Sequence, residues 1–390
     1  MIYVTPKLLQ ECEEVVEQVD SIRDQLRSAL RSPKRWFGVL RRSTFARNIR
    51  GSNSIEGYNV TEEDAIAAAD GEEPLDAESE TWAAVSGYRN ALTYVLQLAD
   101  DPHFRYGEGF IRSLHFMMLS YDLPKHPGNW RPGPIYVRDD ERREVVYEGP
   151  DAAMVPGLMA ELFDSLNADD DAPVVIRAAM AHLNLVMIHP FSDGNGRMAR
   201  CLQTLALARE GILDQRFSSI EEYLGRYTRE YYAVLGAVGQ GSWLPTNDAR
   251  PWIRFCLNAH FNQATTLLKR TKELERVWDE LEVMIGSQGL PYRVIYALSD
   301  ATFGFRVRNA TYRSIAEVTQ PVASRDLQLL VEKGLLIATG EKRGRIYAAS
   351  DVLKSLRQRT REPKPAYKPA IPTQLRLPGI EHAQSGPLTF

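Results

Sequence analysis

The sequence predicts a mainly α fold, in which a helical bundle carries one β-hairpin and is followed by a winged helix-turn-helix domain. Over most of the first 285 residues, apolar side chains recur at three- and four-residue spacing, which is typical of amphipathic helices. One pair of short strand-forming runs interrupts this pattern, and a helix, helix, helix, hairpin order begins near residue 290. The predicted regions are an N-terminal helical region at 1–110, a helical core at 111–285, the winged helix-turn-helix domain at 290–360 and a disordered tail at 361–390.

The composition of the 390 residues, 44% hydrophobic and 25% charged, is that of a soluble globular protein. No run approaches the ~18 consecutive apolar residues of a membrane span, so no membrane partner is expected. The opening MIYVTPKLLQECEEVVEQ turns acidic where a signal peptide would be apolar, and we therefore expect a cytoplasmic protein. A net charge of -4 gives no overall attraction to nucleic acid. The three cysteines are too far apart for a CxxC metal site, and disulfides are not expected: Cys12, Cys201 and Cys256.

Successive helices are expected in the N-terminal region. The stretch LLQECEEVVEQVDSIRDQLRSAL has charged residues between its apolar ones, as an amphipathic helix does. A helix through FARNIRGSNSIEG should end at Gly57, because glycine accepts the left-handed geometry of a helix end. In TEEDAIAAADG, Thr61 and Asp64 are placed to cap the start of a helix and Gly71 to end it. Further helices are expected at ETWAAVSGYRNALTYVLQLA and FIRSLHFMML.

A β-hairpin is predicted at residues 135–148. Its strands are the runs at 135–138 and 145–148, which lie on either side of the polar group DDERR. Two strands are only marginally stable without packing support, so a hairpin among helices calls for a reason. A surface hairpin without any role is the alternative.

The apolar run VVIRAAMAHLNLVMI predicts a central, buried helix of the bundle. His182 lies within it and His189 follows its end. The two histidines are seven residues apart, whereas helical metal-binding pairs are usually four apart. We therefore expect His182 to be a hydrogen-bonded structural residue.

The segment HPFSDGNGRMAR, residues 189–200, follows this helix directly. Asp-Gly and Asn-Gly are also common turn dipeptides, so DGNG alone would indicate a simple turn. Here, however, the glycines let backbone amides turn inward at the start of the next helix, where anions bind. Arg197 and Arg200 can grip phosphate oxygens from one face of that helix, and the Asp193 carboxylate suits a magnesium ion. With a pKa near about 6.5, His189 is suited to general-base catalysis.

This segment resembles the Fic family signature, HxFx(D/E)GNGRxxR, at every fixed position. The resemblance covers the helical core from about residue 45 to residue 260, and many longer Fic proteins also carry a C-terminal winged helix. It implies that residues 111–285 are a Fic catalytic core, which transfers AMP from ATP to a Ser, Thr or Tyr hydroxyl of a target protein and releases pyrophosphate. The matching residues are His189, Phe191, Asp193, Gly194, Asn195, Gly196, Arg197 and Arg200.

The same resemblance implies a role for each matched residue. His189 would accept the proton of the attacking hydroxyl, Asp193 would bind magnesium, and Phe191 would pack beneath the loop. The ATP phosphates would be bound by the backbone amides from Gly194 to Gly196 and by Asn195, with Arg197 binding the β-phosphate and Arg200 the γ-phosphate.

Two further segments gain a role from the resemblance. The 135–148 hairpin resembles the flap with which the family aligns a target protein, by pairing with an extended segment of it. EYLGRYTREYYAVL resembles the helix that borders the adenine, which makes Tyr231 and Tyr232 candidate contacts of the base, with core packing as the alternative.

SNSIEG, residues 52–57, resembles the family's inhibitory pattern (S/T)xxxE(G/N) through Ser52, Glu56 and Gly57. A carboxylate paired with Arg200 would occupy the cation meant for the γ-phosphate, so Glu56 is expected to inhibit the enzyme. The alternative is an ordinary carboxylate at a helix end. Two other functions stay open. One is a phosphodiesterase that removes AMP with the help of Glu56, and the other is an ATP-sensing DNA-binding regulator, although an intact His189 argues against the regulator.

The C-terminal domain is more basic than the whole chain. A recognition helix PVASRDLQLLVEKG and a wing KRGR could contact DNA phosphates, and a protein-interaction or homodimer-packing module is an equal alternative. The basic residues of the domain are Arg306, Arg308, Arg313, Arg325, Lys333, Lys342, Arg343 and Arg345.

Overall fold

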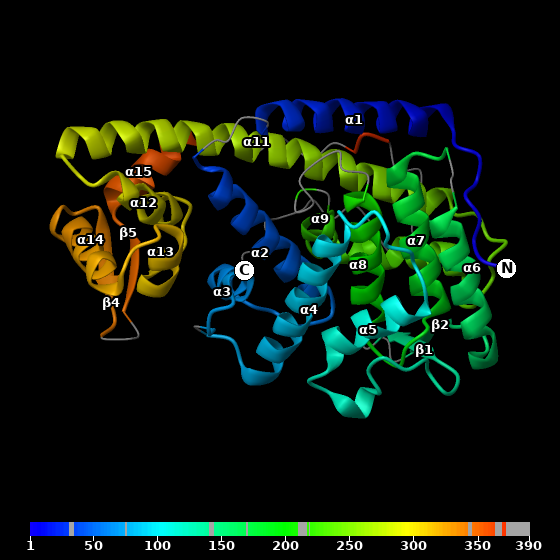
Figure 1. Cartoon of the computed structure of the whole chain (residues 1–390). Coiled ribbons are helices and arrows are strands. Elements are labelled where there is room, and N and C mark those ends of the chain that lie inside the picture. Colours follow the sequence, from blue (N-terminus) through cyan, green and yellow to red (C-terminus); the bar gives the residue numbers. More distant parts are fainter. Residues whose placement is uncertain are drawn as a thin grey trace.

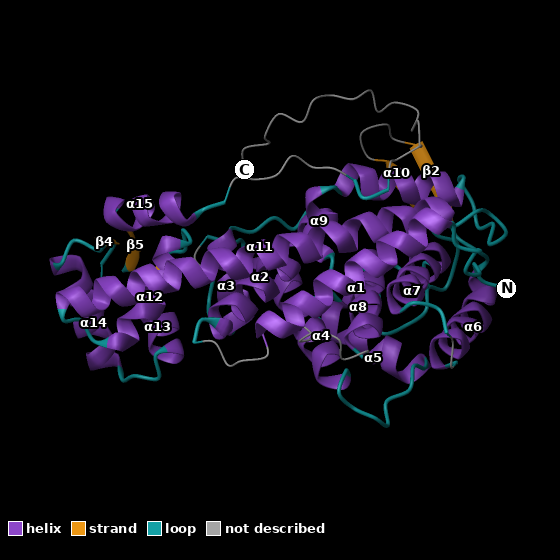
Figure 2. Ribbon diagram, turned by 90° about the horizontal axis from the view of Figure 1, so that it is seen from above, coloured by secondary structure: helices purple, strands orange, loops and turns teal. Residues whose placement is uncertain are grey.

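The structure is a computed structural model in which a large helical bundle and a smaller C-terminal domain lie along one long helix, α11 (Figure 1). Helix α1 runs beside the bundle half of α11, and the C-terminal domain lies near its far end (Figures 1 and 2). None of the helices that the structure describes is both long and apolar enough to cross a membrane. The described residues are 1–30, 35–74, 76–139, 144–168, 171–209, 217, 219–341, 345–362 and 369–371.

The bundle has the helices that the apolar spacing predicts. Thr61 accepts a hydrogen bond from the Asp64 amide at 3.1 Å, and Gly71 and Gly57 adopt left-handed φ angles of 73° and 83°, as the predicted helix ends require. The α-helices are α1 Gln10–Leu30, α2 Phe37–Ile55, α3 Glu62–Asp70, α4 Ser79–Leu98, α5 Glu108–Leu119, α6 Val155–Asn167, α7 Val174–Ile188, α8 Asn195–Ala208, α9 Glu221–Arg226, α10 Thr228–Gly239 and α11 Arg250–Gln288. Two short 3-10 helices, η1 Leu123–Lys125 and η2 Ala152–Met154, lie in the connections.

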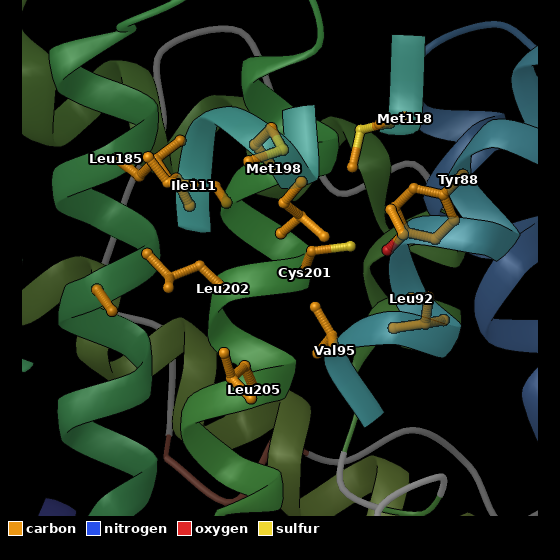
Figure 3. Packing of buried hydrophobic residues seen from close by; sticks show 14 of the residues in the cluster. Tyr88, Leu92, Val95, Ile111, Met118, Leu185, Met198, Cys201, Leu202 and Leu205 are labelled. Atoms are coloured by element: carbon orange, nitrogen blue, oxygen red, sulfur yellow. The ribbon is translucent and has the colours of Figure 1, made fainter. Parts of the chain in front are cut away.

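Helices α7 and α8 form the centre of the bundle and carry the predicted motif between them. His182 is fully buried in α7, where its ring nitrogens lie 2.6 Å from Gln203 Oε1 and 2.9 Å from the Tyr231 hydroxyl. The expectation of a structural histidine is therefore confirmed. The three cysteines are buried and unbridged. Figure 3 shows α8 side chains packed between those of α7 and α4: Leu185, Met198, Cys201, Leu202, Leu205, Tyr88, Leu92 and Val95.

The predicted hairpin is present as the antiparallel strands β1 Tyr136–Asp139 and β2 Glu144–Glu148. Its packing support is Tyr147, which is buried and donates a hydrogen bond from its hydroxyl to the Met187 carbonyl of α7 at 2.7 Å. Tyr136 and Val145 are exposed. Tyr147 thus anchors the hairpin to α7, while most of the other strand residues that the structure describes are exposed.

The C-terminal domain has the element order expected of a winged helix-turn-helix, with a three-stranded antiparallel sheet in the order β3-β5-β4. Lys342 and Arg343 of the predicted wing lie outside the described residues. The elements are η4 Tyr292–Val294, α12 Ile295–Thr302, β3 Val307–Arg308, α13 Asn309–Ile315, α14 Gln320–Glu332, β4 Leu336–Thr339, β5 Ile346–Ala349 and α15 Asp351–Thr360.

Ile371 departs from the expectation that residues 361–390 lack fixed structure. Its side chain is buried, and its backbone exchanges two hydrogen bonds with the Asn258 side chain of α11, at 2.9 and 3.1 Å. A buried asparagine therefore satisfies both its donor and its acceptor with one residue of the tail. Most of the remaining tail lies outside the described residues.

Candidate functional site

The loop between α7 and α8 is closed by the side chain of Asn195. Its Oδ1 accepts a hydrogen bond from the Phe191 amide and its Nδ2 donates one to the Phe191 carbonyl, both at 2.9 Å. Left-handed residues begin and end the turn, His189 with φ 52° and Gly194 with φ 76°. Both polar groups of the Asn195 side chain are therefore used within the loop. The side chain thus closes the loop, and the Asn195 backbone amide stays the candidate for binding phosphate.

His189 has the protonation that a general base needs. Its Nδ1 lies 3.0 Å from the Val186 carbonyl, which can only accept, so Nδ1 carries the proton and Nε2 keeps its lone pair. Burial lowers the pKa of the imidazole from its usual value, and therefore favours the neutral form. The ring is thus oriented and neutral at the end of α7.

His115 of α5 contacts the loop between α7 and α8 and fixes its position. Sequence reasoning missed this role. Its ring stacks on Phe191 with 3.7 Å between the ring centroids and an angle of 7° between the planes. Nδ1 accepts a hydrogen bond from the Gly128 amide at 2.8 Å, so Nε2 is the protonated nitrogen and donates to the Asp193 carbonyl at 3.0 Å. Burial lowers the pKa of His115 to about 4. The only signal in the sequence was a histidine in the apolar run FIRSLHFMML.

Asp193 lies at the rim of the site, with its side chain one-third exposed. Oδ1 accepts a hydrogen bond from the Gly194 amide at 2.7 Å, and Oδ2 lies 3.5 Å from the Lys125 ammonium of η1. In the described part of the chain, no group of three or more His, Cys, Asp or Glu residues could hold a metal ion. A magnesium ion here would have Asp193 as its protein ligand and would need phosphate oxygens and water for the rest.

Arg197 is a buried cation, and two of its guanidinium nitrogens lack hydrogen-bond acceptors. Its residue is 1% exposed, and its Nε and Nη1 have no partner within the described structure. Its guanidinium carbon, Cζ, lies over the Tyr58 ring at 5.2 Å from the ring centre, which is a cation–π contact. This contact provides no hydrogen-bond acceptor for Nε or Nη1. Buried unpaired donors on a charged group are costly, so this arrangement suits an anionic ligand.

Arg200 is also buried, but the predicted inhibitory residues already bind it. Its Nε donates to Ser52 Oγ at 2.6 Å, and its Nη2 donates to Glu56 Oε1 at 2.6 Å. Burial acts to lower the pKa of Arg200, but the Glu56 carboxylate, together with the nearby Tyr231 and Tyr88 side chains, raises it above its usual value. A Cβ atom at Gly196 would overlap Glu56 Oε1, so this glycine makes room for the carboxylate at the start of α8.

The two tyrosines predicted to border the adenine lie in different environments. Tyr231 is 1% exposed and its hydroxyl is bonded to His182 in the core, so it offers no surface to a nucleotide. This corrects the expectation for Tyr231. Tyr232 is 48% exposed, and its hydroxyl donates to the Ile55 carbonyl at 3.3 Å, next to Glu56. Of the pair, Tyr232 stays a candidate.

Two of the residues that make the C-terminal domain basic are paired with carboxylates of the bundle. Arg306 lies 2.6 Å from Asp76 and 3.3 Å from Glu63, and Arg308 lies 3.3 Å from Glu72. Arg308 lies in β3 and Arg306 directly before it, whereas the three carboxylates belong to α3 and to the segment after it. The positive surface of the C-terminal domain is therefore smaller than its composition suggests, and DNA binding stays a prediction.

Comparison with known proteins identifies the motif region. Residues 107–207 match the Fic/DOC family. The chain is 27% identical over 295 residues to a protein adenylyltransferase Fic of Nematostella vectensis, covering 70% of this chain and 63% of that protein. It is 36% identical over 175 residues to a protein adenylyltransferase fic-1 of Caenorhabditis briggsae, covering 44% of this chain and 31% of that protein. The chain thus spans less than two thirds of these relatives.

Two solved structures share the fold. A Fic family protein from Desulfovibrio desulfuricans G20 superposes with a TM-score of 0.56 and 23% identity, over 89% of this chain and 98% of that chain. Fic-1 from C. elegans superposes with a TM-score of 0.52 and 23% identity, over 67% of this chain and 73% of that chain. At this identity the likeness supports the fold alone.

Proposed function

Since residues 107–207 match the Fic/DOC family, we propose that the chain is a protein adenylyltransferase, which transfers AMP from ATP to a hydroxyl side chain of a target protein. One observation carries most of this proposal. Two buried arginines at the start of α8, Arg197 and Arg200, keep N–H groups without partners in the described structure, and they lie in the helix that follows a neutral His189. Such donors suit the phosphates of a nucleotide.

His189 Nε2 accepts the proton of the target hydroxyl as its oxygen attacks the α-phosphorus of ATP. A bond then forms between the hydroxyl oxygen and the α-phosphorus, and the bond from the α-phosphorus to the oxygen that bridges to the β-phosphate breaks. Pyrophosphate leaves with that bridging oxygen. Arg197 binds the β-phosphate and Arg200 the γ-phosphate, while the amides of residues 194–196 bind phosphate oxygens.

Magnesium fits the same site. Asp193 would be its protein ligand, and the ion would neutralise the charge of the α- and β-phosphates. Lys125, 3.5 Å from Asp193 Oδ2, balances the carboxylate charge in this structure.

The target protein is aligned by the hairpin of residues 135–148, the flap. Its strands pair with each other, and Tyr136 and Val145 stay exposed. An extended target segment that pairs with the flap would present its hydroxyl to His189. We also expect the protein to be cytoplasmic and to form a homodimer.

Glu56 restrains this activity by binding Arg200, the ligand of the γ-phosphate. With its carboxylate 2.6 Å from Nη2, ATP either binds weakly or binds with its α-phosphorus turned away from the hydroxyl. The inhibitory segment, residues 52–57, therefore sets the resting rate.

Gly51→Ala is expected to release this restraint, because it would displace the helix that carries Glu56. A Cβ atom at Gly51 would lie 2.5 Å from the Glu221 carbonyl oxygen of α9, and one at Gly225 would lie 2.6 Å from the Gly51 carbonyl oxygen. The two backbones are in direct contact, so overpacking should cost about 1–3 kcal/mol of unfolding free energy. Self-labelling with radioactive ATP should rise.

Gly38→Ala is the matched control on the same helix. A Cβ atom there would meet nothing within 4 Å, so the variant should be slightly more stable, by about 0.5–1 kcal/mol, with unchanged labelling. A destabilised Gly51→Ala protein whose labelling stays at the parent level would contradict the assignment of this contact.

The position of the transferred label tests the proposed reaction. The Glu56→Gly protein is incubated with Mg·ATP labelled on the α-phosphorus or on the γ-phosphorus, together with cell lysate. Transfer of AMP predicts that, relative to lysate alone, the Glu56→Gly protein adds protein-bound label from the α-phosphorus and none from the γ-phosphorus. Label from the γ-phosphorus would indicate a phosphoryl transferase, and the absence of label from both, in a protein that binds ATP, would refute the proposal.

A further inference from the structure

Arg131 connects the catalytic loop to both ends of the flap. It lies in WRPGP, between α5 and β1, and is 4% exposed. Its Nε donates to the His189 carbonyl at 2.8 Å, and its Nη1 and Nη2 donate to the Gly133 and Pro150 carbonyls at 2.6 and 2.5 Å. Gly133 precedes β1 and Pro150 follows β2, so one guanidinium binds three separate segments of backbone.

The backbone around Arg131 strengthens this connection. Its amide donates to the Pro190 carbonyl at 2.9 Å, and the Gly149 amide donates to the Ile135 carbonyl at 3.1 Å, which closes the base of the flap. His189 has a left-handed φ of 52°, a conformation that costs a non-glycine residue free energy. The hydrogen bond from Arg131 to the His189 carbonyl favours that conformation.

We propose that Arg131 is a positioning residue that holds the flap at a fixed distance and orientation from the His189 base. A target hydroxyl aligned by the flap then lies within reach of the base. This inference rests on the proposed AMP transfer. It adds a residue that touches neither ATP nor the target but fixes the distance between the two parts that handle the hydroxyl. The guanidinium carries five N–H donors in a fixed planar fork, which lets Arg131 bind these three separated carbonyls at once.

The charge of Arg131 gives the proposal a separate readout. The charged groups that act on the His189 imidazole are Arg131, Glu56 and Asp193, and of these the Arg131 cation lowers the pKa of His189. Replacing Arg131 by Gln should therefore raise the pKa of His189. Replacing Arg131 by Lys keeps the positive charge and should leave the pKa of His189 unchanged. Both variants lose the planar set of guanidinium donors.

The experiment compares Arg131→Gln, Arg131→Lys and Arg209→Gln in the full chain. Arg209 is the matched control, because it also donates to two backbone carbonyls, those of Leu98 and Asp101, but lies at the far end of α8. Four quantities are measured. They are the His189 titration by NMR, amide hydrogen exchange of residues 144–148, and, in the Glu56→Gly background, Mg·ATP affinity together with the rate of labelling.

Both Arg131 variants should label about 10²-fold more slowly, since small misplacements near a reacting centre have effects of that size, while Mg·ATP affinity changes less than about twofold. Exchange of residues 144–148 should speed up in both, and the His189 titration should move upward in Arg131→Gln alone. Arg209→Gln should match the parent. If Arg131→Gln fails to fold, the Lys variant decides through labelling, affinity and exchange.

The proposal is overturned if exchange and labelling in the Arg131 variants equal those of the parent, or if the folded Lys variant loses ATP affinity in step with its labelling rate. If the Glu56→Gly parent binds ATP but transfers no AMP, the proposed function fails by itself. The His189 titration and the exchange of residues 144–148 then still decide whether Arg131 positions the base and the flap, because neither measurement needs catalysis.

Discussion

His189→Ala is expected to lower the rate of AMP transfer by about 10²- to 10⁴-fold, the contribution of a well-placed general base. His189 Nδ1 donates to the Val186 carbonyl, which leaves Nε2 as the proton acceptor. Loss of the imidazole therefore removes this acceptor but no ligand of the phosphates. Mg·ATP affinity, measured by calorimetry, should therefore stay within about twofold of the parent. The exposed His103 provides the control substitution, His103→Ala, which should leave the rate unchanged.

The pH dependence of the same reaction checks the protonation state. Burial lowers the pKa of His189, and the neutral form is the base, so the transfer rate should rise with pH through a midpoint below about 6.5 and stay level above it. The measurement is the initial labelling rate between pH 5 and pH 8 in the Glu56→Gly background. A His189→Ala protein that keeps its rate, or a midpoint well above about 6.5, would remove His189 from the role of base.

Glu56→Gly is expected to raise the initial rate of self-labelling by about 10- to 100-fold at limiting ATP. The substitution removes the 2.6 Å contact with Arg200 Nη2, and a hydrogen bond to a charged group contributes about 1.5–3 kcal/mol. Each 1.4 kcal/mol changes an equilibrium constant tenfold, so the fraction of sites that can bind the γ-phosphate should rise by that factor. The control is Glu78→Gly, at an exposed position before α4, which should have no effect.

More label in the Glu56→Gly protein would also result if Glu56 helped to remove AMP. A chase separates the two roles. Labelled Glu56→Gly protein is purified, freed of ATP and incubated with unlabelled parent protein and magnesium. If the label is stable, Glu56 restrains the forward reaction. If the parent protein releases labelled AMP and unlabelled Glu56→Gly protein does not, Glu56 takes part in removing AMP.

Arg200→Ala should abolish the gain in labelling that Glu56→Gly produces, because the arginine that Glu56→Gly frees for the γ-phosphate is then missing.

The helices could be predicted from the sequence because their signals are local. The capping by Thr61, the left-handed Gly71 and the apolar run of α7 depend on neighbours within a few residues, so spacing and residue type suffice. The same holds for the motif, in which His189 and Gly194 bracket one short loop. The inhibitory contact was a different case, since the resemblance to a family, and not any spacing, predicted that Glu56 meets Arg200.

The points that sequence reasoning did not resolve have a common physical cause, since each concerns what a side chain contacts in the folded chain. Tyr231 and Tyr232 are adjacent in α10 and differ by about 100° around the helix, so only the docking of α10 decides which of them is buried. Asn195 has the chemistry of a phosphate ligand, but the loop uses both ends of its side chain. Arg306 adds to the basic composition of the C-terminal domain, but Asp76, which is distant in sequence, pairs with it in the folded chain.

The sequence by itself determined the chemical groups of this protein: a base, a carboxylate, two arginines and a glycine-containing turn within residues 189–200. It could do so because the backbone brings those groups together over one short loop. The tertiary structure decided what those groups contact. Glu56 reaches Arg200 and Arg131 reaches His189 across many residues of chain, because the packing of α2 on α9 and the closing of the flap bring these segments together. Such contacts depend on the whole bundle, and no local pattern encodes them.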